Sequence, residues 1–140
     1  MISYHCNSNA ILHEPFKTKS DKHCIPAYNA IRRRIAAMGH RVNLQILDSK
    51  ASGEYKRTIE EVWKSTYQLV HPDMHHRNAA ERTIRTFKAH FLAILAGVSP
   101  KFPSYMWDKL LEQAELTLNL MRHATVDPSK SAWGFFYGRP

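Results

Sequence analysis

The sequence feature that most constrains the fold is an amphipathic segment, residues 79–97, preceded by a shorter apolar segment that ends in an acid. Apolar residues of the longer segment recur with the 3.6-residue period of one helix face: Ile84, Phe87, Phe91, Ile94 and Leu95. The shorter segment, residues 41–48, ends in Leu-Gln-Ile-Leu-Asp and predicts a strand buried on both faces. Ligand sites of open α/β sheets are usually built at the carboxyl ends of strands. The pair therefore predicts an α/β fold with Asp48 at its functional edge.

Charge follows one strip of the predicted helix. With Glu81 at zero, Arg85 lies at about 40° and Lys88 at about 340° around the helix axis, so the three side chains share a surface. One interpretation is an ordinary capped helix, with Asn78 near the N-cap and an acid in the first turn. The other is a functional site in which a carboxylate is flanked by two cations.

The rest of the chain alternates between short strands and helices, and we expect one domain over residues 1–140. The expected elements are a hairpin at 1–16, a helix at 26–38, a strand at 41–48, a helix at 53–66, a strand at 67–70, and helices at 79–97 and 104–123. Arg32, Arg33 and Arg34 are predicted to form a solvated helix face, with contact to phosphate as the alternative, and Trp63 to be a core residue, with base stacking as the alternative. The hairpin should turn at Asn7-Ser-Asn9, and the helix at 26–38 should bury Tyr28, Ile31 and Met38 and end before Gly39. The helix at 53–66 should bury Val62 and pair Glu60 with Lys64, and the helix at 104–123 should be capped by Ser104 and bury Trp107 and Met121. Residues 71–77 hold three histidines and an aspartate, which favours a loop that contacts DNA backbone over a metal site.

Composition favours a polyanionic partner. The net charge is +8, with +5 in residues 1–47, zero in 48–78 and +3 in 79–140, so the excess is dispersed over a folded surface. A soluble basic protein without such a partner stays open. Two cysteines, and the lack of a membrane-length apolar run or a signal-peptide core, predict an intracellular protein. Each cysteine directly follows a histidine, which is not the spacing of zinc ligands.

Several stretches together resemble the integrase core of copia-type long-terminal-repeat retrotransposon Pol polyproteins. They are Asn43-Leu-Gln-Ile-Leu-Asp48, Tyr67-Gln-Leu-Val-His-Pro72, His76-Arg-Asn-Ala-Ala-Glu-Arg-Thr-Ile-Arg-Thr-Phe-Lys-Ala-His-Phe91, Phe102-Pro-Ser-Tyr-Met-Trp107 and Gln113-Ala-Glu-Leu-Thr-Leu-Asn119. The resemblance implies a ribonuclease-H-like fold whose three acids hold two Mg²⁺ or Mn²⁺ ions for phosphoryl transfer.

By this resemblance, Asp48 is the second catalytic acid and metal ligand, and Glu81 is the third. The expected DNA-binding residues are Asn78, Arg82, Arg85 and Lys88. The implied partners are retroelement ends and target DNA, with a homo-oligomer left open and no membrane. The implied location is the nucleus or a retroelement particle.

The first catalytic acid has no convincing match within the chain. If residues 1–16 form the hairpin that follows the family's first strand, that strand and its aspartate lie upstream of Met1. We therefore expect a core truncated at its N-terminus, derived from an element whose intact ancestor integrated DNA, and inactive by itself. The alternatives are a non-catalytic nucleic-acid-binding remnant and a purely structural interaction domain.

Overall fold

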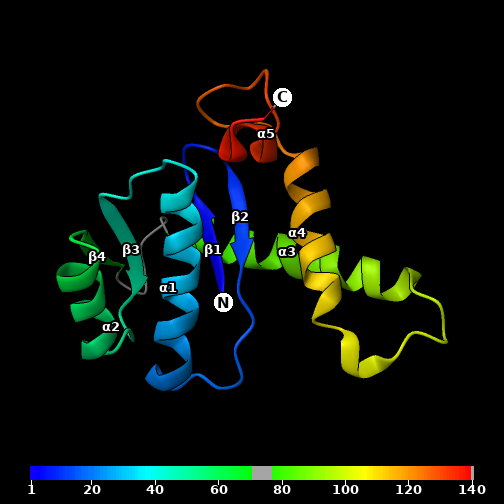
Figure 1. The fold of residues 1–140 in the computed structure, drawn as a ribbon, viewed down its shortest axis with the longest axis horizontal. Helices are drawn as coiled ribbons and strands as arrows, with labels where there is room; N and C mark the ends of the chain where they lie inside the picture. The colour runs from blue at the N-terminus through cyan, green and yellow to red at the C-terminus, as the bar shows by residue number, and fades with distance from the viewer. Residues whose placement is uncertain (71–76, 140) are drawn as a thin grey trace. The chain divides into compact units, whose positions relative to one another are not determined.

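The structure, a computed structural model, describes residues 1–70 and 77–139, and the side chains of 1–70 and 80–139. It is a mixed α/β structure, as predicted (Figure 1). The chain divides into two compact units, and each is described by itself. The first unit comprises Met1 and Phe16–Ala79, and the second comprises Ile2–Pro15 and Ala80–Pro140. The predicted ribonuclease-H-like arrangement and the single domain over residues 1–140 stay predictions.

The first unit packs helices against a two-stranded parallel sheet. Its elements are α1 (Asp21–Ala37), β3 (Leu44–Asp48), α2 (Gly53–Arg57), the π-helical turn η1 (Thr58–Val62) and β4 (Thr66–Val70). In the sheet, Leu44 lies opposite Thr66 and Asp48 opposite Val70. The core contains Tyr28, Leu47 and Ile59, which come from α1, β3 and η1.

Helix α1 begins five residues before its predicted start at Pro26. Proline lacks an N–H, but at the sixth helical position it removes only one intrahelical bond close to the N-terminus, where the cost is smallest. Tyr28 and Ile31 are buried as predicted, whereas Met38 is 39% exposed because it caps the helix rather than continuing it. Gly39 follows with φ +79°, which confirms the predicted glycine after the helix end.

Strand β3 is shorter and less buried than expected. It begins at Leu44 instead of Arg41, and only Leu47 is buried, while Leu44 and Ile46 are 50% and 48% exposed. Successive strand residues point to opposite faces, and the core of this unit lies on the face that carries Leu47. The prediction of burial on both faces was therefore wrong for this unit.

The predicted helix at 53–66 ends at Val62 and changes its winding on the way. The N–H of Trp63 donates to the carbonyl of Thr58 at 3.3 Å, a five-residue spacing that widens the turn. Val62, expected in the core, is consequently 65% exposed. Lys64 lies beyond the turn with φ +50° and forms no ion pair with Glu60 in the described part of the chain, so the predicted pair was wrong.

The second unit is built on an antiparallel hairpin covered by helices. Its elements are β1 (Ile2–His5), β2 (Ala10–His13), most of α3 (Arg77–Gly97), the 3₁₀ turn η2 (Ser104–Met106), α4 (Lys109–Met121) and α5 (Ala132–Tyr137). The hairpin confirms the prediction for residues 1–16, and Asn9 adopts φ +58° at its turn. Its core consists of Ile11, Phe87, Leu111, Ala114 and Leu118.

The long helices bury narrower faces than the sequence predicts. In α3, Phe87 is buried, but Ile84 and Leu95 are 47% and 39% exposed. The predicted helix at 104–123 divides into η2 and α4, and Ser104 does not cap α4. Trp107 precedes α4 and Met121 ends it, so both lie outside the face that packs on the core and are largely exposed.

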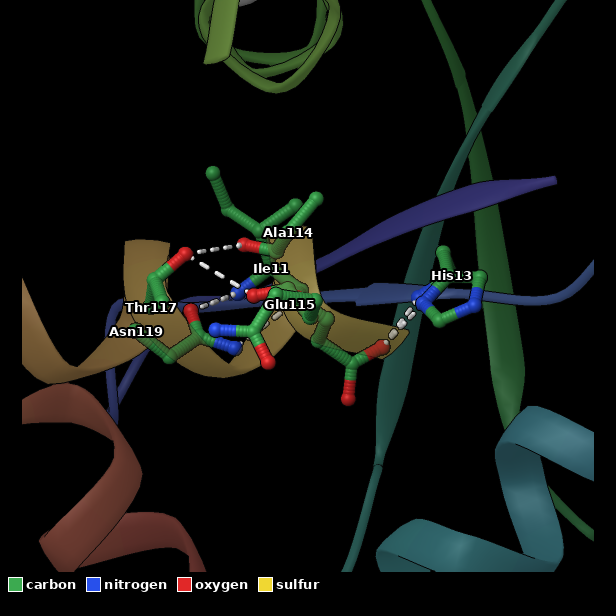
Figure 2. A network of polar contacts seen from close by, with 7 residues as sticks. Ile11, His13, Ala114, Glu115, Thr117 and Asn119 are labelled. Carbon is green, nitrogen blue, oxygen red and sulfur yellow. Dashed lines mark hydrogen bonds and ion pairs between the residues drawn. The ribbon is translucent and has the colours of Figure 1, made fainter. Parts of the chain in front are cut away.

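Helix α4 is fixed to β2 by polar side chains one helical turn apart (Figure 2). The Asn119 amide accepts the N–H of Ile11 at 2.9 Å and donates to its carbonyl at 2.8 Å. The Glu115 carboxylate accepts the backbone N–H of His13 at 2.8 Å and lies 2.7 Å from His13 Nδ1. Four helical residues and two strand residues each span about 6–7 Å, so the two side chains match alternate residues of β2. They occupy backbone groups that an edge strand would otherwise leave unpaired.

Candidate nucleic-acid interface

The N-terminal half of α3 carries the residues predicted to contact DNA. The helix begins at Arg77, so Asn78 lies inside its first turn and is not the N-cap. The side chain of Asn78 lies outside the described residues. Glu81, Arg82, Arg85 and Lys88 are all exposed, and helical geometry aligns Glu81, Arg85 and Lys88 along the axis.

Two of these cations have no partner among the residues that the structure describes. Arg85 and Lys88 are exposed, and neither forms an ion pair or hydrogen bond with another residue that the structure describes. Glu81 and Arg82, by contrast, each interact with another group. Arg85 and Lys88 are therefore the two residues of the strip whose chemistry suits a backbone phosphate. That they bind DNA stays a prediction.

Asp48 lies where the sequence places it, at the carboxyl end of β3. Its side chain is exposed and accepts a hydrogen bond from Ser49 Oγ at 3.2 Å. Its carbonyl accepts the N–H of Ala51 at 3.1 Å, which closes the turn after the strand. Asp48 belongs to the first unit and Glu81 to the second. Their predicted approach as catalytic and metal-binding partners consequently stays a prediction.

The described residues do not assemble a metal centre. Within residues 1–70 and 77–139, no three or more His, Cys, Asp or Glu side chains gather closely enough to hold an ion. Asp48 has oxygen ligands of the kind that Mg²⁺ prefers, but a single carboxylate at a strand end does not define a coordination geometry. The histidine-rich segment 71–77, expected to be a DNA-contacting loop, lies outside the described residues except for Arg77, the first residue of α3.

Sequence reasoning missed Arg32. It was expected on a solvated face, yet it is only 5% exposed. Its guanidinium donates to Tyr28 Oη at 3.0 Å and to Ser65 Oγ at 2.8 Å. The spacing of Tyr28, Ile31, Arg32 and Ile35 is the i, i+3, i+4, i+7 pattern of one helix face. This spacing could have predicted that Arg32 is buried, but the run of three arginines with Arg33 and Arg34 suggested an exposed face.

Trp63 was expected in the core and lies at its border. It is partly buried against the core of the first unit, and its indole N–H donates to Asn29 Oδ1 at 2.7 Å. The guanidinium of Arg32 lies 4.9 Å from the centre of its ring. Trp63 therefore combines a packing role with a cation–π contact to a buried charge.

No protein-family model matches the chain, and no curated protein matches it significantly. None of the helices within the described residues has the length and apolar character needed to cross a membrane.

Proposed function

We propose that this chain is a nucleic-acid-binding domain of the integrase-core type, related to copia-type retrotransposons and ribonuclease-H-like in fold. The observation that carries the proposal is the exposed pair Arg85 and Lys88 on α3, without a partner among the described residues. A net charge of +8 adds a long-range attraction for a polyanion. The order hairpin, helix, strand, helix, strand, helix is also the order that the resemblance implies.

Phosphoryl transfer is the activity that the resemblance implies for the intact ancestor. In that reaction Asp48 and Glu81 would hold Mg²⁺ or Mn²⁺, and the bound metal would supply positive charge at the reacting phosphate. The support for this role is the position of Asp48 at the carboxyl end of a parallel strand. Two acids supply only part of the charge that a metal pair needs. We therefore expect DNA binding without strand transfer from this chain, which is also what a non-catalytic remnant would do.

The test changes Arg85 and Lys88 together to Ala and measures affinity for a short DNA duplex by fluorescence anisotropy at several salt concentrations. Each lost phosphate contact removes about 0.9 from the slope of log K against log salt, so the double variant should flatten the slope by about 1.8. Its loss of affinity should be the same for unrelated sequences, because phosphate contacts carry no base information.

The matched control replaces Lys101 and Lys109, two exposed cations of the same unit, with Ala. It changes the net charge equally and should leave most of the slope intact. Glu81→Gln should bind DNA as well as the original chain or slightly better, because a repulsive charge is removed. Equal slopes in the Arg85/Lys88 variant and the original chain would place the interface elsewhere.

A further inference from the structure

The first unit contains a cavity of about 280 Å³ beside the C-terminal end of α1. The charged and aromatic residues that line it are Arg32, His40, Arg41, Trp63 and Lys64. No acid is among the residues that line this cavity, all of which belong to the described part of the chain. Two arginines and one lysine around one hollow repel each other, and a bound anion would relieve that repulsion.

Arg32 distinguishes this cavity from an ordinary basic surface, because it places a buried and fixed cation in the wall of the cavity. Its guanidinium is buried, and its hydrogen-bond acceptors, Tyr28 Oη and Ser65 Oγ, are both neutral. Ser65 is itself held, because its hydroxyl donates to the carbonyl of Val42 at 2.6 Å. No carboxylate of the described residues pairs with Arg32. A buried charge without a counter-charge is costly even beside the ring of Trp63, and the two hydrogen bonds to neutral partners use only part of the five guanidinium N–H donors.

The carbonyls of the helix end do not occupy these cations. Cations favour a helix C-terminus through the helix dipole and by binding its free carbonyls. The last turn of α1 is already closed, since Gly39 N–H donates to Ala36 at 2.9 Å and His40 N–H to Ile35 at 3.2 Å. Lys64 is held at φ +50°, a conformation that favours glycine or asparagine, so a lysine at this position carries a backbone cost.

We propose that this cavity binds a phosphoryl group, with Arg32, Arg41 and Lys64 as its ligands. Arginine matches phosphate oxygens with paired N–H groups, and lysine adds a point charge. The source is either a free mononucleotide or a phosphate of a nucleic-acid strand. The proposal does not rest on the α3 strip, which contributes no residue to the cavity.

The test is an NMR titration of the full chain, following the Trp63 indole N–H and the Gly39 amide. Inorganic phosphate, adenosine monophosphate and a short DNA duplex are added separately, each against sodium chloride at equal ionic strength. Saturable shifts of both signals are expected with phosphate. If only the mononucleotide saturates the chemical-shift changes, the bound phosphoryl group comes from a small molecule. If the duplex displaces inorganic phosphate, it comes from a nucleic-acid strand.

The decisive variant combines Arg41→Ala with Lys64→Gly, because glycine suits the backbone at residue 64 and preserves the fold. It should weaken phosphate binding at least tenfold. The control, Lys22→Ala with Arg33→Ala, removes two exposed cations of α1 that do not line the cavity and should change affinity less than twofold. The Arg85/Lys88 variant should bind phosphate normally, which separates this site from the proposed DNA interface. Shifts that chloride reproduces, or equal affinity in the decisive variant, would overturn the proposal.

Discussion

Replacing Asn119 with Ala should destabilise the second unit more than any exposed substitution on the same helix. Asn119 is 1% exposed, and its amide holds both the N–H and the carbonyl of Ile11, which is fully buried. The substitution leaves two buried backbone groups without partners, at about 1–3 kcal/mol each. The better helix propensity of alanine returns about 0.5 kcal/mol. The expected loss is therefore about 1.5–5.5 kcal/mol, a large part of the stability of a typical domain.

Two measurements check this loss. Urea denaturation gives the change in unfolding free energy, and native-state hydrogen exchange reports the opening of the Ile11 amide itself. The control, Gln113→Ala, also removes an amide from α4 but at an exposed position. It should alter stability by no more than about 0.5 kcal/mol. The reasoning is refuted if Asn119→Ala matches this control, or if exchange at Ile11 does not accelerate.

The remaining predictions concern pH, metal and catalysis. Burial raises the pKa of Tyr55, and the charge of Tyr28 raises it further. The free energy of unfolding should therefore be unaffected by Tyr55 below the ordinary tyrosine pKa and should fall as pH rises above it, because the unfolded chain loses its proton first. Tyr55→Phe should make this fall smaller in urea denaturation at pH 9 to 12. Added Mn²⁺ should weakly broaden the NMR signals near both Asp48 and Glu81, and Asp48→Asn should abolish this broadening. Broadening near one acid alone would show that the two acids do not share an ion. Strand transfer with Mn²⁺ on a terminal-repeat oligonucleotide should be undetectable, and activity would refute the expectation that two acids are insufficient.

Local pattern predicted most elements because each has a signal within a few residues. The turn at Asn9, the glycine after α1 and the apolar spacing in α1 each require a particular residue type, so their positions follow from the sequence. Element ends were less predictable. Pro26 marks a helix start in most contexts, yet α1 extends beyond it because one lost hydrogen bond near the N-terminus is tolerable.

Burial depends on partners that periodicity does not reveal. Ile46 and Val62 have the hydrophobicity of core residues, but the first unit covers only one sheet face and η1 rotates Val62 outward. Arg32 differs in the opposite direction: its charge suggested exposure, whereas its spacing along the buried face of α1 indicated burial. Asn119 and Glu115 likewise read as ordinary helix residues, and their role depends on β2, which lies more than a hundred positions away in sequence.

The most direct test of the proposed function is the salt dependence of DNA binding by the unaltered chain. If Arg85 and Lys88 each displace a counterion from the duplex, log K should fall linearly with log salt, with a slope of at least about 1.8 in magnitude. Unrelated duplex sequences should give the same slope. No binding at low salt, or an affinity that salt does not change, would contradict the proposal that this chain binds nucleic acid through its phosphates.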